Sequence, residues 1–134
     1  MGEQGGKRTK MGEKGRRGLM GKSYMNLVVW KNACELRRLI YEITKKLPAR
    51  ELRRVSQMCD SAWSVKQNIQ EGYKRASIAQ GSLGELSGDV DDCLEDKLIS
   101  KQEYEVLDNL ISRTDYLFMR LIQSLENKRK AEVI

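Results

Sequence analysis

Apolar residues recur along the chain at alternating spacings of three and four, which places them on one face of an α-helix. The pattern predicts helices over about residues 26–46, 50–71 and 78–97, and a fourth from about residue 100 to near the C-terminus. No stretch suggests a strand. Four helices of about 20 to 27 residues joined by short loops predict an all-α, antiparallel up-down-up-down four-helix bundle.

Each predicted helix contributes one stripe of apolar residues to the expected core. The stripes are Val29, Ala33, Leu36, Ile40, Ile43 and Leu47; Leu52, Val55, Cys59, Ala62, Val65 and Ile69; Ala79, Leu83, Leu86, Val90 and Cys93 or Leu94; and Tyr104, Leu107, Ile111, Thr114, Phe118, Leu121 and Leu125. Leu110, Leu117 and Ile122 widen the apolar face of the fourth helix beyond what one core needs. This width predicts burial on two sides, in the chain's own core and against a second copy.

Local signals set the expected helix ends. Pro48 ends the first helix, because the residue before a proline disfavours helical dihedrals. Gly72 is expected to end the second helix in a left-handed conformation, and Ser77 is expected to cap the third. Ser100 and Glu103 have the spacing of a capping box at the start of the fourth helix.

Three glycines, Gly81, Gly84 and Gly88, lie on one face of the third predicted helix. Each interior glycine costs about 1 kcal/mol relative to alanine. We therefore expect another backbone to approach this face closely. Trp63 lies off the core stripe of the second helix, where it either widens the core face or contacts another subunit. Together these features predict a cyclic homo-oligomer.

The residue types argue against catalysis. The chain contains no histidine, which excludes a Ser-His-Asp triad, a Cys-His pair and histidine-ligated metal sites. The cysteines are Cys34, Cys59 and Cys93. They are far apart and lack a neighbouring base, so we expect reduced core residues. The sequence predicts no enzyme activity and no cofactor.

The third helix ends in acidic residues. Asp89, Asp92 and Asp96 share a face and allow a divalent-metal interpretation. One helix face rarely supplies enough oxygen ligands, so a solvated face, or pairing with arginines of the second helix, is favoured. No metal site is predicted.

The net charge of +6 is concentrated at the N-terminus. Residues 1–22 hold seven basic and two acidic residues, a net +5, together with seven of the eleven glycines. We predict a disordered basic tail over 1–22 and the bundle domain over 23–134. The alternative is that the tail is not part of the working protein, since Met11, Met20 and Met25 are alternative starts.

The tail and two basic segments of the bundle are the candidate contacts for RNA or DNA phosphates. The candidate residues are Lys7, Arg8, Lys10, Lys14, Arg16, Arg17, Lys22, Lys74, Arg75, Lys128, Arg129 and Lys130. No apolar run approaches the roughly 20 residues that cross a bilayer, and the N-terminus does not resemble a secretory signal. We therefore expect a cytoplasmic protein without a membrane partner.

Several ordered motifs resemble the four-helix-bundle family of proteins encoded in intervening sequences of bacterial 23S ribosomal RNA genes. The matching residues are 27–33 (LVVWKNA), Leu47, Pro48, Glu51, Gln57, Ala62, Ser64, Val65, Asn68, Ile69, Glu71, Gly72, Arg75, Ile78, Ala79, Gly81, Ser82, Leu83, Glu85, Leu86, Glu103, Tyr104, Ile122, Ser124 and Leu125. The chain departs from the family at Cys59 and Asp60, where two arginines are common, and at Lys66, where proline is common. It also lacks about ten residues between Ser77 and Ile78.

The resemblance implies a cyclic homo-oligomer, most often a pentamer, without enzymatic activity. A related branch resembles accessory proteins of diversity-generating retroelements, which assist a reverse transcriptase and bind nucleic acid. Two functions follow as hypotheses. The first is association with RNA or another nucleic acid, or assistance to a retroelement reverse transcriptase. The second is a structural or protein-interaction oligomer without a nucleic-acid partner, which the missing arginines and the near-neutral body favour.

Overall fold

The computed structural model describes residues 24–71 and 73–133. Four α-helices form this part of the chain: α2 (Tyr24–Thr44), α3 (Leu52–Glu71), α4 (Ala76–Glu95) and α5 (Lys101–Val133). Two short 3-10 helices, η1 (Ala49–Glu51) and η2 (Tyr73–Arg75), precede α3 and α4. The prediction of an all-α chain with four long helices is confirmed.

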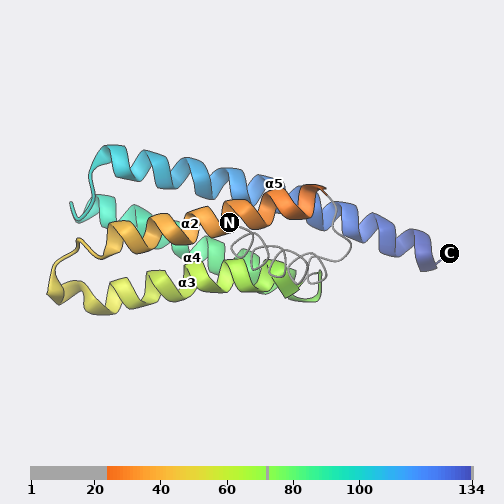
Figure 1. The fold of residues 1–134 in the computed structure, drawn as a ribbon, viewed down its shortest axis with the longest axis horizontal. Helices are drawn as coiled ribbons and strands as arrows, with labels where there is room; N and C mark the ends of the chain where they lie inside the picture. The colour runs from red at the N-terminus through yellow and green to blue at the C-terminus, as the bar shows by residue number, and fades with distance from the viewer. Residues whose placement is uncertain (1–23, 72, 134) are drawn as a thin grey trace, which may run out of the picture.

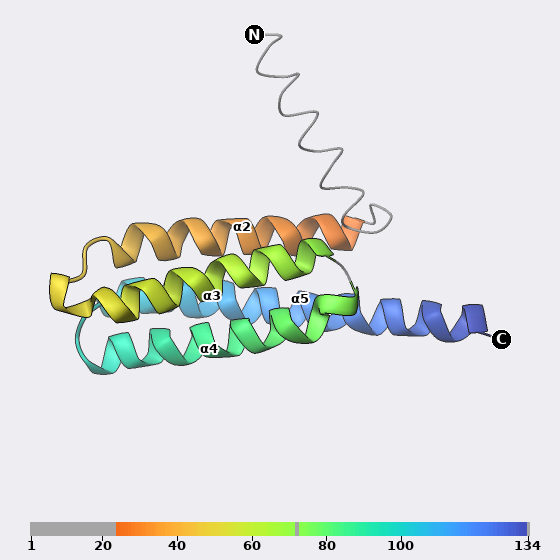
Figure 2. The ribbon, with the colours of Figure 1, turned by 90° about the horizontal axis from the view of Figure 1, so that it is seen from below.

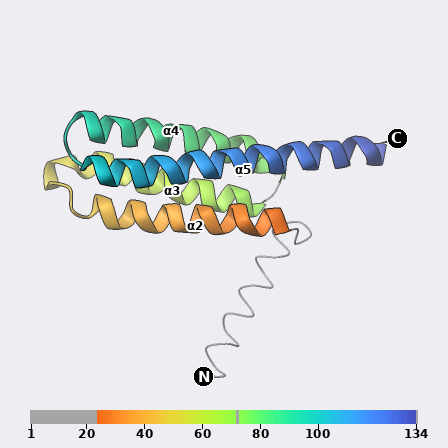
Figure 3. The same ribbon diagram turned by 90° about the horizontal axis from the view of Figure 1, so that it is seen from above.

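The helices form a bundle in which each packs on two neighbours. α2 contacts α3 and α5, and α4 contacts the same two helices. Successive helices run in opposite directions, so the α2–α3 and α4–α5 connections lie at one end of the bundle (Figures 1 and 2). The C-terminal part of α5 extends beyond the other helices at the opposite end (Figure 3). α5 has 33 residues, more than the sequence pattern predicted.

Most of the predicted core is confirmed. Val29, Leu36, Leu86 and Leu107 have no exposed surface, and Val90 is 1% exposed. The expected stripes of α2, α4 and α5 all contribute to one continuous buried cluster. Leu110, Leu117 and Ile122 pack against this cluster with part of their surface left open.

The predicted stripe of α3 is wrong in its first half. Leu52 is 72% exposed, and Val55 and Cys59 are half-buried, whereas Met58 is completely buried. The chain enters α3 through extended Pro48 and the tighter η1 turn, which changes the angular phase of Leu52 relative to the core. Periodicity alone could not decide which of two adjacent side chains, Met58 or Cys59, faces the axis.

The helix ends confirm one prediction and overturn another. At the start of α5, Ser100 N donates to Glu103 Oε1 (2.9 Å) and Glu103 N donates to Ser100 Oγ (3.0 Å), which is the predicted capping box. Ser77 is not a cap, because α4 begins one residue earlier, at Ala76, with Arg75 at its N-cap position and no side-chain cap. The prediction for Gly72 lies outside the described residues, as does the tail.

The glycine face of α4 is open. Gly81, Gly84 and Gly88 are exposed, and a Cβ added at any of them would have no neighbouring heavy atom within 4 Å. No backbone of the described chain therefore approaches this face, and its approach by a second copy stays a prediction. α4 is held to α3 instead through its other side, where Ser64 Oγ and Ser82 Oγ lie 2.7 Å apart.

Candidate nucleic-acid interface

The predicted basic contacts fall into two groups. The tail candidates lie outside the described residues: Lys7, Arg8, Lys10, Lys14, Arg16, Arg17 and Lys22. The bundle candidates belong to η2 and to the last turns of α5. Although far apart in sequence, Lys74, Lys128 and Arg129 line one groove of about 1040 Å³, which we call the C-terminal groove. Lys130 is exposed on the same part of α5.

The C-terminal groove has no net positive charge. Its three cations are matched by three carboxylates, and its floor is apolar. The carboxylates are Glu71, Glu126 and Glu132, and the apolar residues include Ala76, Ile122 and Leu125. A phosphate backbone gains little from a surface on which the charges already balance. The geometry therefore brings the candidates together but weakens the case for phosphate binding there.

Arg75 has a structural partner. Its Nε donates to Asn68 Oδ1 at 3.0 Å. The Asn68 amide in turn donates to the Ser64 carbonyl oxygen (2.8 Å) and to Ser64 Oγ (3.0 Å). Asn68 is only 6% exposed, so this network fixes the α3–η2 connection. Part of the Arg75 guanidinium is thus committed to the fold.

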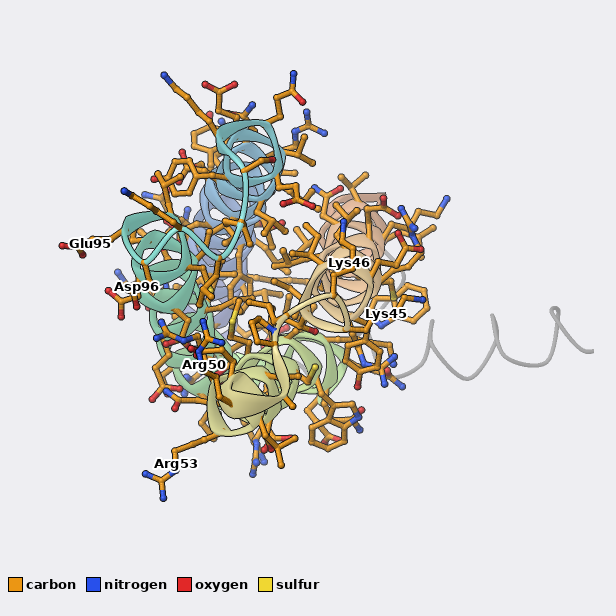
Figure 4. The ribbon with its side chains drawn as sticks, turned by 90° about the vertical axis from the view of Figure 1, so that its left-hand side faces the viewer. Lys45, Lys46, Arg50, Arg53, Glu95 and Asp96 are labelled. Atoms are coloured by element: carbon orange, nitrogen blue, oxygen red, sulfur yellow. The ribbon has the colours of Figure 1, made fainter. Side chains whose placement is uncertain are left out.

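A second basic surface, absent from the sequence-based candidates, lies at the opposite end of the bundle. Residues 45–54 (KKLPARELRR) carry five basic residues against Glu51, a surplus of +4. We call Lys45, Lys46, Arg50 and Arg53 the basic turn. In Figure 4, Arg50 lies between the two lysines and Asp96, and Arg53 points away from the bundle. The run of basic residues is visible in the sequence, but which of its charges the fold pairs with carboxylates is not.

Local ion pairs neutralise most of the acidic groups near the basic turn. Arg54 donates to Glu51 (2.8 Å) and to Asp96 (2.9 Å), which confirms pairing between α3 and the acidic end of α4. Lys46 pairs with Glu103 at 2.7 Å and lowers the pKa of that carboxyl. Within the described residues, Lys45, Arg50 and Arg53 have no carboxylate within 4.0 Å. These three cations are available for an external anion.

α4 has the opposite character. It contains five acidic residues and no lysine or arginine. Burial, then the nearby charges of Asp92 and Glu85, raises the pKa of Asp89. Tyr104 donates its hydroxyl to Asp91 at 2.9 Å. In the described part of the chain, no group of three or more acidic or cysteine side chains could hold a metal ion, and a polyanion would be repelled from this helix.

The three cysteines are free thiols. Cys93 is buried, whereas Cys34 and Cys59 are only half-buried. Burial raises the pKa of the Cys34 thiol more than Lys66 and Arg37 lower it, so the thiolate is disfavoured. Burial also raises the pKa of the Cys93 thiol. Neither Cys34 nor Cys93 therefore has the depressed pKa of a reactive cysteine.

The predicted oligomer contacts remain accessible on one chain. Trp63 is 47% exposed, and the three α4 glycines are open. Other large apolar side chains are also exposed: Tyr41, Leu52, Ile78, Val106, Tyr116 and Met119. Among the described helices, none is long and apolar enough to cross a membrane.

These features define a class of protein: an all-α four-helix bundle that carries exposed basic residues at both of its ends. Residues 25–119 match the model of the 23S rRNA-intervening sequence protein family. The chain belongs to that family, which is not a known enzyme family. A search of curated proteins finds no match.

Proposed function

We propose that this protein is a non-enzymatic helical bundle that associates with nucleic acid, with RNA as the preferred candidate. The observation that carries the proposal is the surplus of +4 over residues 45–54, together with the three cations there that have no carboxylate partner in the described chain. Lysine and arginine side chains bind phosphates through charge and hydrogen bonds, without reading the base sequence. The basic tail adds a second source of phosphate contacts.

The proposal is tested by fluorescence anisotropy of the full chain with labelled single-stranded RNA over a range of salt concentrations. We expect weak binding, little preference for sequence, and a slope of log K against log salt of about −0.7 for each phosphate neutralised. Deleting residues 1–22 should reduce this slope while leaving the helical circular dichroism signal unchanged. Absence of binding by the full chain at physiological salt would contradict the function.

A second candidate function is a protein-interaction oligomer. The exposed Trp63 and the open glycine face of α4 favour it, because both leave apolar or close-packing surface without a partner in the chain. A cyclic homo-oligomer, with a pentamer as the first candidate, would cover such surface. Family resemblance also makes a reverse transcriptase a candidate protein partner. Multi-angle light scattering that shows a monomer at micromolar concentration would contradict the oligomer.

A further inference from the structure

We propose that the basic turn, and not the C-terminal groove, is the phosphate-binding site on the folded body of this protein. The inference rests on the proposed nucleic-acid function and names the surface that performs it. The ligand is the sugar–phosphate backbone of RNA, held by Lys45, Arg50 and Arg53.

Charge balance separates the two surfaces. In the C-terminal groove, every cation has a carboxylate counterpart on the same lining. At the basic turn, the nearby carboxylates form ion pairs with other cations: Arg54 pairs with Glu51 and Asp96. Lys46 likewise pairs with Glu103. We call Lys45, Arg50 and Arg53 the outer cations. They are exposed and form no ion pair in the described chain, so they can bind a phosphate.

The backbone beneath the outer cations is ordered by short-range bonds. Leu47 N donates to the Thr44 carbonyl oxygen at 3.0 Å, and Glu51 N donates to the Pro48 carbonyl oxygen at 2.9 Å. Arg54 adds a bond between the start of α3 and the end of α4. Such a framework fixes the backbone from which the cations extend, so binding orders fewer groups than it would on a flexible segment.

The acidic helix sets one edge of the site. Glu95 and Asp96 extend from α4 on the side of the basic turn opposite Lys45 and Lys46 (Figure 4). Asp96 is paired, but Glu95 has no cation within 4.0 Å in the described chain. A phosphate chain is therefore attracted to the basic turn and repelled at α4, which directs the RNA away from the glycine face of α4.

The test uses the full chain and two triple variants with the same change in charge. One is Lys45→Gln, Arg50→Gln and Arg53→Gln; the matched control is Lys128→Gln, Arg129→Gln and Lys130→Gln. With labelled oligouridine, we expect the first triple to weaken binding by roughly tenfold or more and to reduce the salt slope by about 2. The control should change each quantity much less. Charge-conserving replacement, Lys45→Arg with Arg50→Lys and Arg53→Lys, should retain binding.

The outcomes separate the site from the function. If wild type binds but the first triple binds as tightly as the control triple, the site assignment is overturned and the general function stands. If wild type itself does not bind oligouridine, both the site assignment and the proposed function are overturned. Circular dichroism of each variant shows whether the bundle is intact. If the first triple unfolds, the single variant Arg53→Gln decides, since unchanged binding and an unchanged salt slope in that folded variant overturn the site assignment. Inorganic phosphate that competes as well as RNA would also overturn it, because it would indicate a site for a single anion.

Discussion

Asn68 Oδ1 accepts a hydrogen bond from Arg75 Nε at 3.0 Å, across the connection between α3 and α4. The same asparagine donates to Ser64, whose hydroxyl meets that of Ser82 on α4. All four residues belong to the motifs on which the family resemblance rests. These four residues therefore help to specify how α3 and α4 join.

The Asn68 network predicts a stability effect. Asn68→Ala should lower the free energy of unfolding by about 1–3 kcal/mol, because it removes the hydrogen bonds that the buried Asn68 amide makes with Ser64 and with the exposed Arg75. Urea unfolding followed by circular dichroism measures it. The control, Gln57→Ala, changes an exposed α3 residue and should stay within about 0.5 kcal/mol of wild type. Equal stability of both variants would mean that the network contributes little.

Met58 and Leu52 provide a test of the α3 register. Met58→Ala should cost about 2–5 kcal/mol, because it leaves a cavity in the core. Leu52→Ala should cost less than about 0.5 kcal/mol, because this side chain is mostly in solvent. Thermal or urea denaturation of both variants in parallel decides the point. Similar losses would place Leu52 in a buried contact with another copy.

The register of α3 also shows where sequence-based prediction ends. Spacing located four helices and most of the core, because a helix that buries one face must place apolar residues at three- and four-residue intervals. It failed at Leu52, where a 3-10 turn shifts the phase. It also assigned Ser77 as a cap, although α4 begins at Ala76. Local preference could not show which charges the fold would pair.

The candidate site was predictable only in part. Lys74, Lys128 and Arg129 were visible as basic residues, but their matching carboxylates come together only in the folded chain. Conversely, the pairing of Arg54 with Asp96 spans 42 positions and frees the outer cations of the basic turn. Charge balance at a surface depends on such long-range neighbours, which no local pattern contains.

The capping box at α5 predicts a pH dependence. The hydrogen bond from Lys46, and then that from Ser100 N, lowers the pKa of Glu103 from its ordinary 4.5. A lowered folded-state pKa gives stability that is present above about pH 4.5 and lost as the pH falls through the folded value. Glu103→Gln keeps the cap but removes the charge, so its stability should change less over this range.

The measurement for Glu103 is the difference in unfolding free energy between wild type and Glu103→Gln from pH 7 to pH 3. The raised pKa of Asp89 acts with the opposite sign in both proteins and cancels in this difference. We expect an advantage of wild type of about 0.5 kcal/mol at neutral pH, as for a partly exposed ion pair. A difference that does not depend on pH would exclude the charged pairing.

The glycine face of α4 tests the oligomer. Gly84→Met adds a side chain where the single chain has open space, so the monomer should fold normally and gain up to about 1 kcal/mol in helix stability. If a second copy packs there, the same change should dissociate the oligomer in light scattering. Lys31→Met, on exposed α2 surface, is the matched control. An unchanged oligomer in both variants would place the interface elsewhere.

Glu95 predicts a gain of binding. Within the described chain, Glu95 forms no ion pair, whereas the neighbouring Asp96 pairs with Arg54. Glu95→Gln should strengthen oligouridine binding by about twofold, which corresponds to roughly 0.5 kcal/mol for one surface charge.

The control variant is Asp115→Asn, which also removes one negative charge. Asp115 lies about 20 Å along α5 from the end of the bundle that carries the basic turn, so this variant should have a smaller effect. Anisotropy titrations at low and physiological salt measure both, and the gain should shrink as salt screens the charge. Equal gains from both variants would mean that RNA responds to net charge alone rather than to a site beside α4.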